Sequence, residues 1–342
     1  MSPEYASTPL NATANGGSGV HEARVALPSP WRMYHGDSLP QAHVAFRLIG
    51  PAGAPVVAAL GGISAHRVVA GEKGVGWWCE GVGPGGAIDT DRYRVLGIDY
   101  IGGSGESTSP DGSGEFPPVS AFDQAEALRR VIDFLGLPSL HAIVGASYGG
   151  MVALSFAARH PACVGRLVVL SATDRTPPLS TAWRAVQRQI VREARARGDG
   201  PAGLRLARAL AMTTYRSAAE FEQRFSAVPV RAGNRYRFPV EDYLFARGDH
   251  YALQYRAESF LALSESIDLH DMDAAAVRTP ATVVAVLEDQ LAPIHAMRAF
   301  AGRLGNLRRL VEISSIFGHD AFLKEGGALL PIIQSALAEG AA

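Results

Sequence analysis

A serine at position 147 has the sequence surroundings of a catalytic nucleophile. It lies in the stretch Gly145–Gly150 (GASYGG), after an apolar run at 140–144 and before a segment at 148–159 whose apolar residues have helical spacing. The glycines allow the strand and the helix to approach closely at a strained turn, which a Cβ atom would prevent. The start of a helix offers unpaired N–H groups and the positive end of its dipole to a developing oxyanion. The stretch therefore predicts covalent acyl chemistry at Ser147.

Two further side chains can complete a catalytic triad. A predicted buried strand at 281–287 ends in Glu288 and Asp289, and a predicted strand at 309–314 leads into a loop that holds His319. Active-site residues of open α/β sheets lie beyond the carboxyl ends of the strands. A glycine-flanked serine alone also occurs by chance at ordinary strand–turn–helix junctions. The order serine, acid, histidine, each beyond a strand, is that of an α/β-hydrolase triad, with Asp289 as acid, Glu288 as the alternative acid, and His319 as base.

Acyl transfer also needs two backbone N–H donors for the tetrahedral oxyanion. One is the N–H of Tyr148, directly after the nucleophile. The other is expected from the loop after a predicted strand at 55–61, where Ile63 or Gly62 is the candidate.

These residues fit an α/β-hydrolase fold, a mostly parallel sheet covered by helices on both faces. The alternation of predicted strands and helices supports that fold, because parallel strands need crossover connections. Strands are expected at 43–49, 55–61, 93–100, 140–145, 166–171, 281–287 and 309–314. Helices are expected at 119–135, 148–159, 293–304 and near the C-terminus.

The chain divides into a tail and one catalytic domain. Residues 1–22 are rich in Ser, Thr, Asn, Ala and Gly and are expected to be disordered, and residues 23–342 form the domain. From about 174 to 273 the alternation gives way to helical patterns, at the position where this fold commonly carries a lid. Arginines recur there at helical spacing and are expected to form a solvated helix face: Arg184, Arg188, Arg192, Arg195 and Arg197.

The composition excludes several classes of function. The 342 residues are 47% hydrophobic and 19% charged with a net charge of -1, which gives no basis for nucleic-acid or membrane binding. The two cysteines, Cys79 and Cys163, make no disulfide framework and no metal-ligand pattern. No run approaches the ~20 apolar residues of a membrane helix, and the N-terminus lacks the features of a signal peptide. We expect a cytoplasmic protein with no metal and no bound cofactor.

Several sequence blocks, in order, resemble the homoserine O-acyltransferases, enzymes of methionine biosynthesis in the α/β-hydrolase superfamily. The resemblance runs from about residue 43 to the C-terminus. The blocks are Trp77-Trp78, Gly83–Thr90, Gly102–Thr108, Gly145–Met151, Ala207-Arg208, Thr214–Ser217, Asp268–Asp271 and Gly318–Phe322. The blocks inside the insertion are the most specific, since lids differ widely between hydrolase families.

The resemblance implies an acyl transfer from acyl-CoA to the hydroxyl of L-homoserine, through an acyl-serine intermediate and with ping-pong kinetics. It implies that Arg208 binds the acceptor carboxylate with Tyr215 nearby, and that Asp320 binds the acceptor ammonium. Without the resemblance, a surface helix position for Arg208 and a helix cap for Asp320 would be the better interpretations. Several members are homodimers packed through lid helices, and we expect a homodimer here.

The acyl donor is assigned from Arg67, which follows the expected oxyanion loop. Succinyl-CoA carries a carboxylate that acetyl-CoA lacks, and a partly buried pair with a cation would favour succinyl by ~1–3 kcal/mol. An exposed loop arginine is the alternative interpretation, and acetyl-CoA the alternative donor.

Other acceptors remain open on sequence alone. Close relatives in the family acylate serine, which is one methylene shorter, a difference of ~1–3 kcal/mol in a pocket. Water as the acceptor would make an esterase or thioesterase. Arg208 and Asp320 argue against hydrolysis, because a hydrolase has no need to hold an amino acid.

Overall fold

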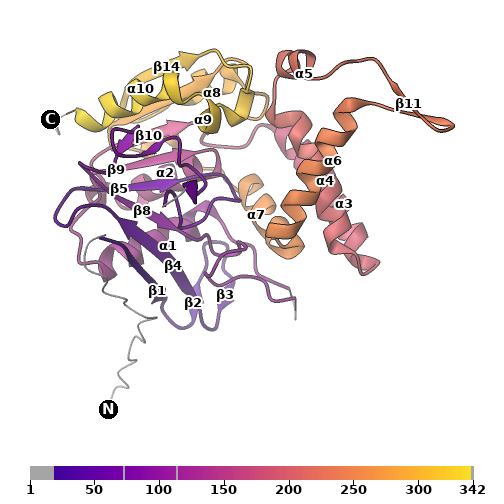
Figure 1. Ribbon diagram of the computed structural model, residues 1–342. Helices are drawn as coiled ribbons and strands as arrows, with labels where there is room; N and C mark the ends of the chain where they lie inside the picture. Colours follow the sequence, from indigo (N-terminus) through magenta and orange to yellow (C-terminus); the bar gives the residue numbers. More distant parts are fainter. Residues whose placement is uncertain (1–18, 72–73, 113–114, 340–342) are drawn as a thin grey trace.

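The computed structural model of the chain describes residues 19–71, 74–112 and 115–339. Its centre is an eight-stranded sheet with the strand order β1-β4-β8-β5-β9-β10-β13-β14 (Figure 1). The strands are β1 (His21–Ala26), β4 (His43–Ile49), β5 (Val56–Leu60), β8 (Arg94–Ile98), β9 (Ala142–Ala146), β10 (Leu167–Leu170), β13 (Ala281–Val286) and β14 (Leu307–Ile313). The strands β1 and β4 pair antiparallel, as do β4 and β8, and the other neighbours in the sheet run parallel. The predicted mostly parallel sheet is confirmed.

Helices cover both faces of this sheet. The helices are α1 (Ala121–Phe134), α2 (Tyr148–Arg159), α8 (Ile294–Ala301), the short α9 (Ala321–Lys324) and α10 (Gly326–Ala338). The first three of these contribute to one apolar core, and α10 contributes to a second core on the opposite face. Alternate side chains of the fully buried β5 enter the two cores, with Ala58 and Leu60 in the first and Val57 and Ala59 in the second. This is the pattern of a parallel strand buried on both faces.

The expectation of a disordered tail at 1–22 is wrong at its end. Residues 1–18 lie outside the described part of the chain, but His21 and Glu22 begin β1 and pair with Leu48 and Arg47 of β4. Only Val25 of this edge strand is buried, so the sequence carries no apolar run that would have indicated it. Short strand pairs were missed for the same reason: β2 (Trp31–Arg32) with β3 (Ser38–Leu39), β6 (Val82–Gly83) with β7 (Ile88–Asp89), and β11 (Val230–Ala232) with β12 (Arg235–Arg237).

The segment from 174 to 273 is helical apart from the β11–β12 hairpin. Its helices are α3 (Pro178–Ala196), α4 (Gly200–Tyr215), α5 (Ala218–Arg224), α6 (Pro239–Gln254) and α7 (Ala257–Asp268). They extend to one side of the sheet, with α7 nearest to it (Figure 1). The helices α3 and α4 pack closely at Gly203, where a Cβ atom would lie 2.5 Å from the Cβ of Ala194. Val191, Leu204, Phe260 and their neighbours give these helices a small apolar core of their own.

Hydrogen bonds fix α7 to the part of the domain that contains the central sheet. The Ser259 hydroxyl donates to the Gly103 carbonyl over 2.9 Å, and the hydroxyls of Tyr148 and Ser266 lie 2.6 Å apart. Because Tyr148 follows the predicted nucleophile, α7 contacts the domain directly behind the site. No helix in the described residues is long and apolar enough to cross a membrane.

A buried histidine in the loop after α7 makes stability depend on pH. His270 is 2% exposed, and burial lowers its pKa to about 4 against the opposing influence of Asp271. Between pH 4 and 6.5 the unfolded chain therefore binds a proton that the folded chain does not. We predict that His270 lowers the free energy of unfolding by about 2 kcal/mol between pH 7 and pH 5.

Chemical denaturation at both pH values measures this effect. The His270→Leu variant is expected to lose this part of the pH dependence, whatever its stability at pH 7. The same substitution at the exposed His295 serves as the control and is expected to keep it. Equal pH dependence in wild type and His270→Leu would contradict the prediction.

Candidate active site

Ser147 lies at a sharp turn between β9 and α2. Its backbone has φ 54° and ψ -122°, in a region that residues with a side chain seldom adopt. The turn is possible because Gly149 packs directly on β5, where a Cβ atom would lie 2.2 Å from the Leu60 carbonyl oxygen. A Cβ atom on Gly145 would lie 2.3 Å from the Gly149 carbonyl oxygen. Both glycines are therefore required by close packing, and this packing presents Ser147 at the carboxyl edge of the sheet.

Ser147, His319 and Asp289 form a continuous hydrogen-bonded chain. The Nε2 atom of His319 lies 2.8 Å from the Ser147 hydroxyl, and its Nδ1 atom lies 2.8 Å from a carboxylate oxygen of Asp289. The other oxygen of Asp289 accepts hydrogen bonds from the backbone N–H groups of Leu291 and Ala292. This is the arrangement in which an imidazole can remove a proton from a serine hydroxyl.

The electrostatic environment of the His319–Asp289 pair suits His319 as a general base. Burial alone would raise the pKa of Asp289, but the neighbouring His319 and the two backbone donors outweigh it and lower that pKa. Burial alone would lower the pKa of His319, but the charge and hydrogen bond of Asp289, with a further contribution from Asp320, raise it. The imidazolium that forms during proton transfer is thus stabilised by a fixed negative charge.

The alternative acid, Glu288, has a different position. Its carboxylate accepts hydrogen bonds from the Ser314 hydroxyl and the Ser315 N–H, over 2.6 and 2.7 Å. Glu288 therefore ties the end of β13 to the loop that leads to His319, and Asp289 alone contacts the imidazole.

The expected oxyanion donors come from two segments next to Ser147 in the chain or in the pocket lining. The N–H of Tyr148 is at the first position of α2, and Gly62 and Ile63 line the same pocket as Ser147. Hydroxyl groups hold this loop in place: Tyr100 donates to the Gly61 carbonyl over 2.8 Å, and Tyr255 donates to the Ile63 carbonyl over 2.7 Å. The side chain of Tyr148 is fully buried, so only its backbone can serve the site.

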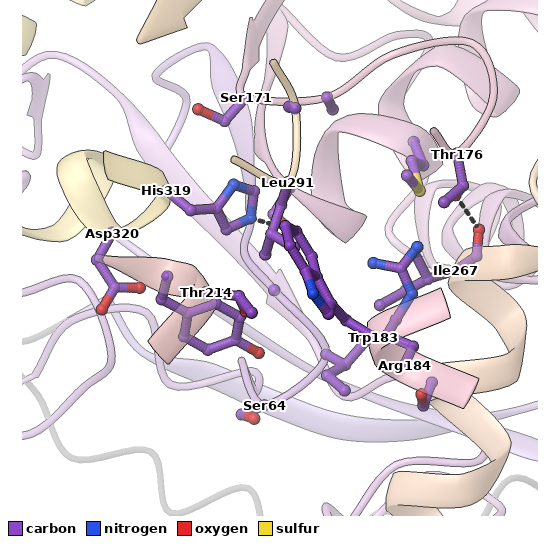
Figure 2. Close-up of a pocket in the computed structure, with 18 of the residues that line it drawn as sticks. Ser64, Ser171, Thr176, Trp183, Arg184, Thr214, Ile267, Leu291, His319 and Asp320 are labelled. Atoms are coloured by element: carbon purple, nitrogen blue, oxygen red, sulfur yellow. Dashed lines mark hydrogen bonds between the residues drawn. The ribbon is translucent and has the colours of Figure 1, made fainter. Parts of the chain in front are cut away.

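Residues of the lid helices line the pocket that contains Ser147 (Figure 2). Arg208 on α4 lines it, with its guanidinium 5.1 Å from the ring centre of Tyr215 and 4.7 Å from that of Tyr251. No carboxylate in the described residues forms an ion pair with Arg208. A guanidinium that contacts two aromatic rings and forms no ion pair with a carboxylate of the described chain can bind the carboxylate of a ligand.

Asp320 lines the pocket beside the base and supplies the opposite charge. It is 13% exposed at the side chain, and one carboxylate oxygen lies 3.0 Å from Nε of Arg216. Asp320 is also among the groups that act on the pKa values of both Arg208 and His319. The three sequence candidates Arg208, Tyr215 and Asp320 are therefore brought together next to the triad.

Arg67 is not brought to the site. Its guanidinium pairs with Asp99 and Glu106, each over 2.6 Å, and its backbone N–H donates to Asp99 over 2.7 Å. Asp99 is 1% exposed, so this pair is a structural one that closes the loop after β5. Arg67 is absent from the pocket lining in the described part of the chain, and the expectation that it selects the acyl donor is wrong in this respect.

Two pocket residues, Trp183 and Arg184, and Tyr251, whose ring packs on Arg208, were not predicted from the sequence as parts of the site. The expectation of a solvated arginine face holds for Arg192, Arg195 and Arg197, which are exposed. It is wrong for Arg184 and Arg188, whose side chains are 11% and 10% exposed and pair with Asp268. Their partner lies 80 or more residues further along the chain, and helical spacing gives no signal of it. Within the described residues, no group of three or more His, Cys, Asp or Glu side chains could hold a metal ion.

The raised pKa of His319 predicts a specific pH dependence. The imidazole must be neutral to act as a base, so enzyme acylation is expected to decline as pH falls through a pKa above 6.5. In Asp289→Asn the charge that raises this pKa is gone, so the profile should move to lower pH and the rate should fall by about 10⁴-fold. Glu288→Gln, at the neighbouring position, should lose much less and keep the wild-type profile. Stopped-flow acylation across pH tests both variants, and a larger loss in Glu288→Gln would reverse the assignment of the acid.

Comparisons with known proteins show the family of the chain. A family model described as alpha/beta hydrolase fold matches residues 61–325. The chain is 42% identical to a homoserine O-succinyltransferase of Xanthomonas campestris over 85% of this chain and 78% of that protein. It is 33% identical to a serine O-succinyltransferase of Litchfieldella anticariensis over 92% of this chain and 97% of that protein.

Solved structures share the same architecture. A homoserine O-acetyltransferase from Bacillus anthracis superposes with a TM-score of 0.83 at 20% identity, covering 94% of this chain and 99% of that chain. Esterase E22 superposes with a TM-score of 0.82 at 19% identity, covering 93% and 100%. The chain belongs to the α/β-hydrolase family and, within it, to the homoserine and serine O-acyltransferases.

Proposed function

We propose that this protein transfers an acyl group, succinyl in preference to acetyl, from coenzyme A to the hydroxyl of L-homoserine. The observation that carries the proposal is the pairing of a hydrogen-bonded Ser147–His319–Asp289 chain with an unpaired cation, Arg208, and an anion, Asp320, in one pocket. A zwitterionic amino acid presents the complementary pair of charges. A pocket that only had to admit water would need neither.

The first half-reaction acylates the enzyme. The Ser147 hydroxyl attacks the thioester carbonyl carbon, and its proton passes to Nε2 of His319. The N–H groups of Tyr148 and of Ile63 or Gly62 stabilise the tetrahedral oxyanion. The carbon–sulfur bond then breaks, the coenzyme A sulfur takes the proton from His319, and an ester on Ser147 remains.

The second half-reaction transfers the acyl group. Nε2 of His319 takes the proton of the acceptor hydroxyl, whose oxygen attacks the ester carbonyl. The bond to Ser147 breaks, and the serine oxygen regains its proton from His319. Because water competes at ~55 M, the acceptor must be positioned strongly enough to react first. Arg208, Tyr215 and Asp320 supply that positioning in this proposal.

The succinyl donor and the homoserine acceptor are favoured by the relative that is 42% identical. The relative that acylates serine is less similar, at 33% identity, but is matched over nearly its whole length, so L-serine is the second candidate acceptor. The biosynthetic chemistry fits a cytoplasmic enzyme that makes an activated amino acid on the way to methionine, with acyl-CoA as co-substrate and no bound cofactor.

A competition assay tests the reaction. Acetyl-CoA and succinyl-CoA are offered together with L-homoserine and L-serine, and products are resolved by mass spectrometry. O-succinylhomoserine is expected as the main product. O-acetylhomoserine would overturn the donor, O-acylserine the acceptor, and free succinate or acetate would make the protein a hydrolase.

Arg208→Gln should separate the two half-reactions. We predict that kcat/KM for the acceptor falls about 10- to 100-fold, because a charge-assisted bidentate contact to its carboxylate is lost. Acylation by the donor, measured without acceptor, should stay within about twofold of wild type. An equal loss in both half-reactions would remove the role of Arg208 as an acceptor clamp.

We further propose that the protein is a homodimer packed through the lid. Large apolar side chains are exposed on neighbouring lid helices, with Val186 54% exposed on α3 and Leu206 44% exposed on α4. Multi-angle light scattering should give twice the mass of one chain for wild type and a monomer for Val186→Glu/Leu206→Glu. A monomeric wild type, or a dimer that survives the double substitution, would contradict the proposed interface.

A further inference from the structure

We propose that Arg184 binds the terminal carboxylate of a dicarboxylic acyl group on Ser147 and thereby selects succinyl over acetyl donors. The inference rests on the proposed acyl-transfer function and names a residue that decides its donor. Arg184 extends from α3 to the wall of the pocket that contains Ser147 and His319 (Figure 2).

The position of the Arg184 guanidinium is fixed. Its Nε and Nη2 atoms donate to one carboxylate oxygen of Asp268 over 2.8 and 2.6 Å. The side chain is only 11% exposed, and the Thr181 hydroxyl donates to the same oxygen. The remaining nitrogen, Nη1, has no hydrogen-bond partner within the part of the chain that the structure describes. An immobilised guanidinium with one unpaired nitrogen in the pocket lining can bind a carboxylate with little loss of conformational entropy.

The positive charges of Arg184 and Arg188 exceed the negative charge of Asp268, with which both pair. Asp268 is shared between Arg184 and Arg188, whose Nη1 lies 2.5 Å from the second carboxylate oxygen. The other hydrogen bonds of Arg188 go to the neutral Ser264 carbonyl and hydroxyl. Two cations and one anion leave one positive charge at the pocket wall. The charge of Arg184 also acts on the pKa of His319, which places it within electrostatic reach of the reacting groups.

This cation is separate from the one assigned to the acceptor. Arg208 and Asp320 act on each other electrostatically and suit the two ends of an amino acid. In the view of Figure 2, Asp320 and Arg184 lie on opposite sides of His319. Succinyl transfer to homoserine brings two carboxylates into the pocket, and Arg184 and Arg208 can pair with one each. Acetyl transfer would leave one of these guanidinium groups without a partner.

The wall between the base and Arg184 suits the methylene groups of a succinyl chain. In the same view, Leu291 and Trp183 lie between His319 and Arg184, and both line the pocket. Their apolar surfaces can pack against two methylene groups while the far carboxylate reaches Arg184. The acyl group would then contact apolar side chains along its length and a cation at its end.

The donor half-reaction tests the inference without any acceptor. Acylation of Ser147 is followed by intact-protein mass spectrometry with succinyl-CoA, its uncharged terminal amide, and acetyl-CoA. Wild type should prefer succinyl-CoA to the amide, and Arg184→Gln should reduce the ratio of the two kcat/KM values by about 10- to 100-fold. At a pH where His319 is neutral in both proteins, acylation by acetyl-CoA should fall less in Arg184→Gln than acylation by succinyl-CoA, and circular dichroism shows whether the variant is folded.

Two further variants make the result specific. Arg184→Lys retains the charge but not the fixed fork, and should keep part of the preference for succinyl-CoA. Arg192→Gln removes an exposed arginine two turns along the same helix, and should leave the ratio at its wild-type value. An unchanged ratio in Arg184→Gln, or an equal loss in Arg192→Gln, would overturn the inference. Failure of all donors to acylate wild type would instead overturn the proposed function.

Discussion

The close approach of Gly149 to the backbone of β5 is the contact on which the site depends. With no Cβ at this position, the first turn of α2 lies directly on the Leu60 carbonyl, and Ser147 is held at φ 54°. That backbone strain places the hydroxyl within 2.8 Å of His319 and leaves the start of α2 facing the same space. Packing between β5 and α2 thus sets the backbone geometry of the nucleophile.

The lid helices hold parts of the catalytic machinery as well as the acceptor. Tyr251 on α6 stacks over Arg208, and its hydroxyl lies 2.9 Å from the Ser64 hydroxyl in the loop of the expected oxyanion donors. Tyr255, at the end of the same helix, donates to the Ile63 carbonyl. One helix therefore positions an acceptor cation and a loop that faces the nucleophile, so the geometry of both half-reactions depends on where α6 lies.

Much of the architecture could be predicted from the sequence, because buried parallel strands leave continuous apolar runs. The strand at 43–49 was predicted at its observed bounds, and the other predicted strands of the sheet differ from those observed by at most two residues at either end. The residues of the triad could be proposed because each lies in the turn or loop that follows a predicted strand. The edge strand β1 could not, since its side chains are mostly exposed and its pairing with β4 is set by backbone hydrogen bonds.

The arginines show a second limit of sequence reasoning. Arg67 and Arg184 each pair with a carboxylate that is distant in the sequence, 32 and 84 residues away. Spacing along the chain does not reveal these partners. From the sequence, Arg67 was therefore expected to bind a ligand and Arg184 to face solvent. The balance of charge distinguishes them: Arg67 is matched by Asp99 and Glu106, whereas Arg184 shares its carboxylate with Arg188.

The hydrogen bond from Tyr255 to the Ile63 carbonyl has a consequence for the fate of the thioester. A lid that moved away from the sheet would release the carbonyl of the residue whose N–H is expected to face the oxyanion. The open form would then admit water while its transition-state stabilisation was relaxed. In such an open form, exposure to solvent and catalytic competence would exclude each other, and the acyl donor would be protected from hydrolysis.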